Sequence, residues 1–494
     1  MRLHDNEALW EAVQAADQVV PVFFDEPAMR AAPDTGELHW YMIHQGLQGL
    51  RTTLRSQGAE LLVSDRDLPE GFEELYRTIP FDCIYAEEET GTAWSFARDR
   101  AVRRWARERR IMLREFPHNG VIRRLSTREE RMNVWHQRMN LLPRPAPVCP
   151  MSPTIRTLAS GTPLPEAPEK SDYPAAQRCD EYSAHRVLTS FLAHRSVNYQ
   201  RGISKPRDSR STGSRLSVHL AWGTISLRTV VHQLWQREEE LRQEVTQTSD
   251  PTARTALRTH QRALKAFSSR LFWHDHFAQR LEDEPQMEFH ALNPAYEHLM
   301  YENDPELLQR WVTGTTGFPL VDAAMRALIH TGFVNFRMRA MLVSFACHVL
   351  HLDWRLIRDP MARVMADYLP GIHISQLQMQ AGVVGINTIR IYNPGKQLLD
   401  HDPECRFVHR FVPELREQAA DHICREAVAQ TGSPKRAEAV TQMDLFPPEE
   451  SMLKYRQRAA VMRDRLWEIR KSSAGRSEGK RVLERHGSRF RRRS

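Results

Sequence analysis

Thr316-Gly-Phe-Pro-Leu-Val-Asp-Ala-Ala-Met-Arg326, followed by Gly332-Phe-Val-Asn-Phe-Arg-Met-Arg339, is the most informative part of this 494-residue sequence. Apolar residues recur in this region at helical spacing, which predicts two strongly apolar helices over residues 319–330 and 335–351. Helical patterns continue in both directions, with few strand-like runs. We therefore expect residues 178–470 to form one large all-α domain.

Residues 1–136 show a different pattern, in which short apolar runs alternate with helical stretches. The apolar runs predict strands over residues 19–24, 60–63 and 82–86. Because strands that alternate with helices favour a parallel, Rossmann-like sheet, we expect an α/β domain here. The chain opens on a helix-like segment, residues 5–10, so the first strand of such a sheet is missing.

Two segments outside these domains have a biased composition. Residues 137–177 are rich in Pro, Ser and Thr, which predicts an interdomain linker. Residues 471–494 are strongly basic and are expected to form a disordered tail. The chain carries a net charge of +7, which indicates a polyanionic partner such as DNA. The alternative is a solvated tail that only aids solubility.

The overall composition excludes several other classes of protein. Apolar residues make up 41% of the chain, too many for a disordered protein. No apolar run reaches the length of about 18 residues that indicates a membrane span. The first residues lack the apolar core of a secretory signal. Because the six cysteines are scattered, a reducing compartment is favoured, and we expect a cytoplasmic monomer.

A run of small hydroxyl residues around one glycine, Ser211-Thr-Gly-Ser-Arg-Leu-Ser217, precedes an apolar helical stretch. Such a segment presents backbone N–H groups that suit a phosphate. The same pattern is also that of an ordinary helix N-cap. The residues alone leave both alternatives open.

A second cluster, Arg270-Leu-Phe-Trp-His-Asp-His-Phe277, combines an indole, two imidazoles and a carboxylate. His274 and His276 are two residues apart and do not share a helical face, so metal ligation is disfavoured. Aromatic packing within a core is the alternative to a functional role.

Two further features indicate a site in the second half. Arg337 and Arg339 lie within an otherwise apolar predicted helix. A buried guanidinium needs a carboxylate, a phosphate or a ligand carbonyl, although an internal ion pair would also satisfy it. Residues 367–382 and 385–394 are polar and contain glycines, yet they follow core helices. Burying them is unfavourable without a ligand or a hydrogen-bond network, so we expect a site there.

These motifs resemble those of the photolyase/cryptochrome family, in the same order and spacing over about residues 2–415. The two apolar helices are similar to that family's long helix signature and to the stretch that wraps its flavin. Further similar segments are Gly213-Ser-Arg-Leu-Ser217, Leu352-Asp-Trp-Arg355, Arg390-Ile-Tyr-Asn-Pro394 and Phe411-Val-Pro-Glu-Leu415. Arg2-Leu-His-Asp-Asn-Glu-Ala-Leu9 resembles the motif that follows the family's first strand, so either the true start lies upstream of Met1 or the sheet lacks a strand.

The resemblance implies FAD held in a U-shape within the helical domain, and it leaves a second, antenna chromophore of unknown identity open for residues 1–136. Carried over position by position, FAD binding falls to Tyr199, Gly213, Ser214, Arg215, Leu216, Ser217, His274, Asn335, Arg339 and Asp367. His274 stands where many members have arginine. Met365 stands where many have an aspartate that pairs with the residue at Arg339.

The sequence departs from the family where repair of pyrimidine dimers is concerned. Arg270 stands in place of a glutamate, Leu377 replaces one pocket tryptophan while Trp273 keeps the other, and Gly371 replaces an asparagine that faces flavin N5. The substrate contacts assigned by the resemblance are Arg270, Trp273, Phe336, Arg337 and Leu377.

The family's light-driven relay of three tryptophans is altered as well. Trp354 matches the middle member, Ser375 replaces the member nearest the flavin, and Tyr301 replaces the outer one. The catalytic candidates are Trp273, Trp354, Tyr301 and Gly371. One branch of the family binds an iron–sulfur cluster through four cysteines. Only three cysteines lie beyond residue 200 here, so no metal is expected.

The resemblance implies a blue-light-driven lyase that flips a UV lesion out of DNA and repairs it by electron transfer from reduced FAD. The alternative is a cryptochrome-like photoreceptor without repair activity. The basic charge and Trp273 favour DNA repair, whereas Arg270, Leu377 and Gly371 count against repair of ordinary cyclobutane dimers.

Overall fold

The computed structural model describes residues 1–125, 128–431 and 455–487, which form two compact units. Unit 1 comprises Met1–Tyr199, Ser214–Pro285 and Met365–Ile372. Unit 2 comprises Gln200–Gly213, Gln286–Val364 and His373–Ser494. Residues 178–199, 214–285 and 365–372, which the sequence assigns to the helical domain, cluster with residues 1–177 in unit 1.

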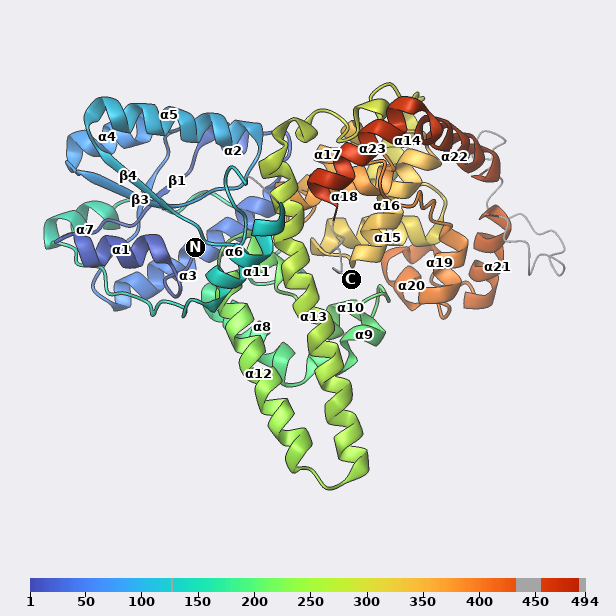
Figure 1. Ribbon diagram of the computed structural model, residues 1–494, viewed down its shortest axis with the longest axis horizontal. Coiled ribbons are helices and arrows are strands. Elements are labelled where there is room, and N and C mark those ends of the chain that lie inside the picture. Colours follow the sequence, from blue (N-terminus) through green and yellow to red (C-terminus); the bar gives the residue numbers. More distant parts are fainter. Residues whose placement is uncertain (126–127, 432–454, 488–494) are drawn as a thin grey trace. The chain divides into compact units, whose positions relative to one another are not determined.

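The N-terminal part of unit 1 is the α/β domain that the sequence predicts (Figure 1). Its elements are α1 (Glu7–Ala15), β1 (Val22–Phe24), α2 (Pro27–Arg30), α3 (Glu37–Ser56), β2 (Leu62–Ser64), α4 (Glu70–Thr78), β3 (Cys83–Glu87), α5 (Ala93–Arg109) and β4 (Met112–Phe116). The strands pair in parallel, β1 with β2 and β3 with β4. Strand β4 is an addition to the three predicted strands.

Helix α3 carries the apolar face that covers this domain. Trp40, Ile43, Leu47 and Leu54 are all at most 3% exposed, and they pack with Leu61, directly before β2. Burial of such side chains typically contributes about 1.5–3 kcal/mol each relative to exposure. The intervals between the four positions are three, four and seven residues, and these intervals place side chains on one side of a helix.

The remaining elements of unit 1 are helical. They are α6 (Arg128–Asn140), α7 (Pro153–Ser160), α8 (Glu181–Ala193), η1 (Arg195–Asn198), α11 (Ser217–Ala221), α12 (Leu227–Gln247) and α13 (Pro251–Asp283). Helices α12 and α13 lie side by side as a long antiparallel pair (Figure 1). The Ser226 hydroxyl accepts from the N–H of Thr229 at the start of α12. The Asp250 carboxylate caps α13 in the same way, which explains why both helices begin where they do.

The proline-rich segment predicted to be a linker contains one ordered helix, α7. Ser152 accepts from the N–H of Ile155, and Pro153 occupies the first helical position, a combination that favours helix initiation. Just beyond the helix, the Thr162 hydroxyl accepts from the N–H of Val63 in β2 at 3.0 Å. The segment therefore packs against the α/β domain instead of running free as an extended connection.

Residues 365–372 return to unit 1 from much later in the chain. The Trp222 indole donates to the carbonyl of Ala366 at 2.7 Å, and His39 Nε2 lies 3.1 Å from the carbonyl of Met365. The Tyr368 ring stacks on the His39 ring, with 5.5 Å between centroids, and its hydroxyl donates to Asp34 at 2.6 Å. This short segment thus completes the packing around α3 and α11.

Unit 2 is helical throughout its described residues, as the sequence predicts for this half. Its main helices are α10 (Ser209–Thr212), α14 (Pro305–Thr313), α15 (Pro319–Thr331), α16 (Phe336–His348), α17 (Trp354–Arg363), α19 (Pro394–His401), α20 (Arg406–Phe411), α21 (Ala420–Thr431), α22 (Tyr455–Lys471) and α23 (Ser473–His486). Short helical turns lie at η2 (Pro285–Glu288), η3 (Pro294–Tyr296) and η4 (Pro413–Leu415). The α9 (Tyr199–Gly202) and α18 (Pro370–Ala381) helices each begin in unit 1 and end in unit 2. Helices α15 and α16 are buried almost completely and form the core.

The C-terminal tail predicted to be disordered is helical as far as His486. The Ser472 hydroxyl accepts from the N–H of Gly475 and caps α23, while Val482 is fully buried. Arg481 donates to the carbonyl of Leu292 at 2.9 Å. A capped helix with one apolar face can pack despite its basic charge, which is the reason that the charge pattern alone was misleading. Residues 488–494 of the predicted tail lie outside the described residues.

Candidate functional site

Helix α13 carries the cluster from Arg270 to Phe277. The Trp273 ring packs edge-on against His276, with 5.0 Å between centroids, and stacks on Phe277 at 5.6 Å. Trp273 remains partly exposed, so its indole has a rigid position and an accessible surface. Such an aromatic surface can stack on a planar ligand or a nucleobase.

Asp275 anchors this cluster to the N-terminal region. The side chain is fully buried, and its Oδ2 accepts from the N–H of Gly120 and from the indole of Trp135, both at 2.9 Å. Its Oδ1 lies 3.1 Å from Nδ1 of His274. The buried carboxylate therefore orients the ring of His274, which the family resemblance assigns to FAD binding. Within the described residues, no group of three His, Cys, Asp or Glu side chains could hold a metal ion.

Arg270 lies beside Tyr199, another residue assigned to FAD binding. Tyr199 is 5% exposed, and its ring packs edge-on against Phe191 and Phe267. Burial raises the pKa of Tyr199 to about 12, and the neighbouring Arg270 guanidinium partly offsets that rise. The phenol therefore stays protonated at neutral pH. Arg270 itself is exposed at the surface of α13.

The loop predicted to hold a phosphate has a fixed backbone. Gln177 Nε2 donates to the carbonyl of Arg215 at 2.8 Å, and Arg215 Nε donates back to Gln177 Oε1 at 2.9 Å. Arg215 has a left-handed backbone, with φ of 62°. Arg195 donates to the carbonyl of Ser214 at 3.2 Å. These contacts lock the loop in one conformation directly before α11.

The alternative interpretation of this loop, an ordinary side-chain N-cap, does not hold at α11. The N-cap residue is Leu216, which makes no side-chain capping bond. The first turn of a helix leaves backbone N–H groups without acceptors inside the helix, and these groups attract anions. In unit 2, the preceding Gly213 donates its N–H to the carbonyl of Ser209, and an added Cβ would lie 2.5 Å from that oxygen. Glycine is therefore required there.

Gly371 lies at the start of α18 and packs directly on α13. A Cβ at this position would lie 2.6 Å from Cα of Ala278 and 3.2 Å from its carbonyl oxygen. Backbone atoms cannot move aside as a flexible side chain does, so the close approach of the two helices needs a glycine. The structure thus gives Gly371 a packing role. Asp367 lies a few residues upstream, in the turn before α18.

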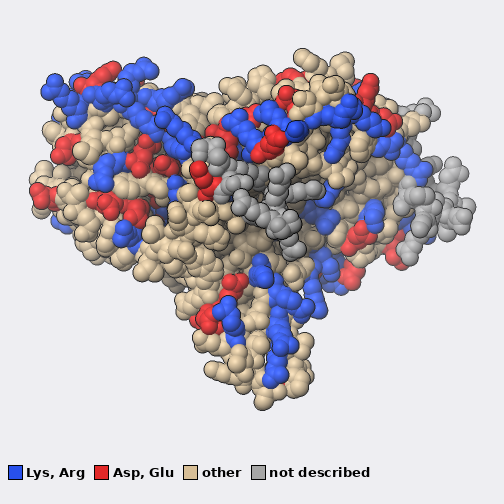
Figure 2. All heavy atoms as spheres, in the orientation of Figure 1, with Lys and Arg blue, Asp and Glu red and all other residues tan. Residues whose placement is uncertain are grey.

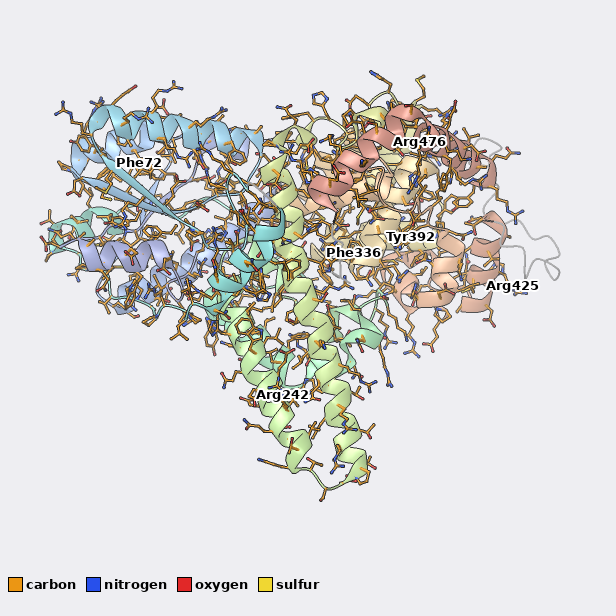
Figure 3. All side chains as sticks on the ribbon, viewed as in Figure 1. Phe72, Arg242, Phe336, Tyr392, Arg425 and Arg476 are labelled. Atoms are coloured by element: carbon orange, nitrogen blue, oxygen red, sulfur yellow. The ribbon has the colours of Figure 1, made fainter. Side chains whose placement is uncertain are left out.

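Helix α16 of unit 2 begins with Asn335, whose amide is engaged within that unit. Oδ1 accepts from the N–H of Met338 at 3.0 Å, and Nδ2 donates to the carbonyl of Ile203 at 3.1 Å. Asn335 is therefore the N-cap of α16, in addition to any contact with a cofactor. The next residue, Phe336, is 52% exposed and labelled in Figure 3.

The two arginines of α16 are only partly buried, which differs from the sequence expectation of buried guanidinium groups. Arg337 donates to Gln397 Oε1 at 3.3 Å. Arg339 donates through Nε to the carbonyl of Val334 at 2.9 Å and lies over the Phe333 ring at 5.6 Å. Residues in the first turn of a helix reach solvent more easily than those in its middle, which explains the difference.

The residues assigned to the electron relay and the second pocket position also lie in unit 2. Trp354 and Leu377 are each 1% exposed, and the Arg355 guanidinium lies 4.6 Å from the Trp354 ring. The Tyr301 hydroxyl is buried, and burial raises its pKa well above 10, aided by the nearby Asp353 carboxylate. Within the described residues this hydroxyl has no hydrogen-bond partner. An oxidised tyrosine readily loses its proton, and no described group accepts a hydrogen bond from this hydroxyl.

The predicted site residues are divided between the two units. Unit 1 holds Tyr199, Ser214, Arg215, Leu216, Ser217, Arg270, Trp273, His274, Asp367 and Gly371. Unit 2 holds Gly213, Tyr301, Asn335, Phe336, Arg337, Arg339, Trp354 and Leu377. Within unit 1, Arg270 and Tyr199 are neighbours, and His274 is adjacent to the buried Asp275.

Sequence reasoning missed Gln177 and Arg195, which hold the loop before α11. Gln177 fell in the predicted linker, and no local pattern marks a side chain that reaches residues almost 40 positions away. Asp275 was noted only as one carboxylate in an aromatic cluster. Its distance in sequence from Gly120 and Trp135 hides its role as an anchor.

Comparisons with known proteins agree with this architecture. Residues 1–132 match the DNA photolyase family, and residues 267–468 match the FAD binding domain of DNA photolyase. A deoxyribodipyrimidine photo-lyase of Thermus thermophilus is 27% identical over 437 residues, which cover 85% of this chain and 91% of that protein. The chain therefore belongs to the DNA photolyase/cryptochrome family and contains that family's FAD-binding domain.

Two solved structures have the same fold. A cryptochrome from Synechocystis superposes with a TM-score of 0.76 at 20% identity, over 94% of this chain and 96% of that one. A bacterial class III photolyase from Agrobacterium tumefaciens gives a TM-score of 0.73 at 21% identity, over 95% and 96% of the two chains. Within the described ranges, the helices of this protein are too short or too polar to span a bilayer.

Proposed function

We propose that this protein binds FAD and uses blue light to repair a UV-induced pyrimidine lesion in DNA. The observation that carries the proposal is the match to deoxyribodipyrimidine photo-lyases over 85% of this chain and 91% of one such protein. Residues 267–468 match the FAD binding domain of DNA photolyase. The accessible, rigid indole of Trp273 on α13 supports a site for a planar substrate.

The residues around α11 fit the diphosphate of FAD. The loop from Gly213 to Ser217 has a locked backbone, two hydroxyl groups and the N–H groups of a helix start, which together suit an anion. Tyr199 stays neutral and so adds no negative charge. Within unit 1, we assign the flavin end to His274 and Asp367. Bound FAD would supply the light-driven electron transfer that splits the lesion.

We assign the substrate contacts of unit 1 to Trp273 and Arg270 on α13. A lesion extruded from duplex DNA needs an aromatic surface for stacking and polar groups for its carbonyl oxygens. Arginine only donates hydrogen bonds, so Arg270 suits carbonyl or phosphate oxygens and not the imide N–H of a pyrimidine. This chemistry favours a lesion other than the ordinary cyclobutane dimer.

Arg270 also supports a second candidate function, a light receptor without repair activity. A family member that never binds a pyrimidine lesion has no need of a carboxylate at this position, and Arg270 already has a partner within the protein in the hydroxyl of Tyr199.

One experiment separates the two candidates. Purified protein with photoreduced flavin is illuminated with short duplexes that each contain one defined dipyrimidine photoproduct, and the products are separated by chromatography. We expect restored pyrimidines only in the light, and much less product from Trp273→Ala than from the native protein. Flavin photoreduction without repair of any photoproduct would reject the lyase and favour the receptor.

A further inference from the structure

The first twenty residues of α13 carry a one-sided charge. Residues 251–270 contain four arginines, one lysine and no Asp or Glu. The neighbouring α12 contains both signs, with four glutamates and three arginines. Figure 2 shows the same contrast on the surface of the α12–α13 pair, where Lys and Arg side chains line the α13 side.

The cations follow one face of the helix. Arg254, Arg258, Arg262 and Lys265 are spaced by four, four and three residues, so they lie within about 80° of the helix circumference and span about 17 Å. The face on the other side of α13 is apolar. Its residues Ala263, Leu264 and Phe267 are at most 3% exposed. The basic face therefore points to solvent along a straight, well-packed helix.

None of these cations forms an ion pair within the described residues, although Glu238 of α12 lies close enough to Lys265 for an electrostatic interaction. Among the described residues, no Asp or Glu oxygen lies within ion-pair distance of Arg258, Arg262 or Lys265. On α12, by contrast, Arg237 pairs with Glu240 and Glu244. The Arg242 of α12, labelled in Figure 3, pairs with Glu239. Like charges at this spacing repel one another, so the α13 face carries a repulsion that its neighbour avoids.

We propose that this face of α13 contacts the phosphate backbone of duplex DNA, beside and independently of any lesion pocket. The inference rests on the proposed function, which supplies DNA as the polyanion. Regularly spaced Lys and Arg are the usual partners of phosphate oxygens, and Thr255, Thr259 and Ser269 border the face with hydroxyl groups. The face lacks large apolar residues, which a membrane surface would require.

The test compares two variants that lose the same charge at the same spacing. The first is Arg258→Gln/Arg262→Gln/Lys265→Gln on α13. The second, a matched control, is Arg100→Gln/Arg104→Gln/Arg107→Gln on α5. All six side chains are exposed, and each set has spacings of four and three residues. Circular dichroism and flavin content establish that both variants fold.

The measurement is binding to an undamaged fluorescent duplex in the dark, by anisotropy, at several salt concentrations. For the α13 variant, we expect the slope of log K (the association constant) against log[salt] to become less negative by about 2–3. We also expect DNA binding at low salt to be about tenfold weaker or more. The α5 control should keep the native slope. Equal losses in both variants, or none in either, would overturn the proposal.

The same two variants distinguish other polyanions and keep this inference separate from the proposed function. A loss confined to anionic vesicles or to an acidic polypeptide, with DNA binding unchanged, would also overturn it. Binding to undamaged DNA in the dark involves no photochemistry, so it is measured independently of repair. If the native protein repairs lesions but the α13 variant keeps the native salt dependence, only the proposed DNA contact is refuted. If the native protein shows no repair but the α13 variant has a weaker salt dependence of DNA binding, the proposed DNA contact still holds and only the proposed function fails.

Discussion

Gly371 illustrates how a position assigned to catalysis can be determined by packing. The sequence suggested that glycine replaces an asparagine that faces the flavin. In the structure, the backbone of Ala278 occupies the space where any side chain at position 371 would begin. An asparagine could not enter without separating the start of α18 from α13, so the chemistry that such a side chain supplies elsewhere must be absent or come from another residue.

Gly371→Ala should therefore lower stability. We expect the free energy of unfolding to fall by about 1–3 kcal/mol, because the added Cβ overpacks a rigid contact. Gly479→Ala in α23 is the control, since the nearest atom to its added Cβ is 3.6 Å away. That variant should be unchanged or more stable by up to about 1 kcal/mol through helix propensity. Urea unfolding measures both, and equal effects would contradict the packing role.

Arg270→Glu should change substrate preference. A carboxylate at this position can accept from the imide N–H of a pyrimidine, and such a charged hydrogen bond contributes about 1.5–3 kcal/mol. We expect the affinity ratio between dimer-containing and undamaged DNA to rise about tenfold or more. Arg270→Met removes the charge without adding a carboxylate or an amide oxygen that could accept from the imide N–H, and it should leave the ratio close to native. All affinities are compared at one fixed salt concentration, and one ratio for all three proteins would mean that Arg270 does not contact substrate.

The sequence indicated candidate residues for the site but not the contacts that hold them in place. Arg270, Trp273 and His274 could be selected because they lie together in one short motif. Gln177, Arg195 and Asp275 act across 19 to 155 residues of sequence, and such contacts leave no local pattern. The cap formed by Asn335 was hidden for another reason, because the family resemblance assigned that amide to the cofactor.

At the scale of elements, strongly periodic helices were predictable and mixed segments were not. The predicted helix over residues 319–330 matches α15, Pro319–Thr331, because its apolar positions recur regularly and Pro319 starts it. Helix α18 was missed because its glycine and glutamines resemble a loop. Tertiary contacts satisfy one of these glutamines: Gln378 accepts from the N–H of Leu292 and donates to the carbonyl of Met287. Strand β4 was missed because its central Arg114 and Glu115 weaken the apolar signal.

Buried neutral histidines should make both units sensitive to acid. Burial lowers the pKa of His348 in α16 to about 4, and that of His219 in α11 to about 4 as well. In the unfolded chain histidine titrates near 6.5, so the unfolded state binds the proton more tightly. The contribution of each buried histidine to the free energy of unfolding is therefore fully present above about pH 6.5 and is lost as the pH falls toward 4. At pH 5, the free energy of unfolding is lower by about 2 kcal/mol per histidine.

His348→Gln should remove the part of the acid-induced loss of stability that is due to His348. Glutamine can still donate to the carbonyl of Ala381, which His348 Nε2 faces at 3.1 Å. We expect the difference in unfolding free energy between pH 7 and pH 5 to shrink by about 2 kcal/mol. His330→Gln, at an exposed position in α15, should leave the difference unchanged. A native pH profile in His348→Gln would show that this histidine is not the titrating group.

For the whole molecule, the proposed cofactor makes a direct prediction. The purified protein should be yellow and should release FAD on denaturation. Ser214→Asp places a negative charge in the loop before α11, where it would repel the diphosphate, so most of the flavin should be lost. Ser211→Asp adds the same charge at an exposed position of the same segment and should keep it. Flavin absorbance per mole of protein measures both, and a colourless native protein that takes up no added FAD would reject the assignment.

The return of residues 365–372 to unit 1 has a consequence for how the protein is made. Unit 1 is otherwise complete in the chain at Pro285, yet its last segment follows only after the 87 residues from 286 to 372 have been added. At roughly 5–20 residues per second, translation of that stretch takes about 4–17 s. During this interval the Trp222 indole and the His39 ring lack the carbonyls and the stacked tyrosine that cover them in the finished fold. We therefore expect the nascent N-terminal half to be a chaperone client on the ribosome, and to be released only after the ribosome has passed the codon for Ile372.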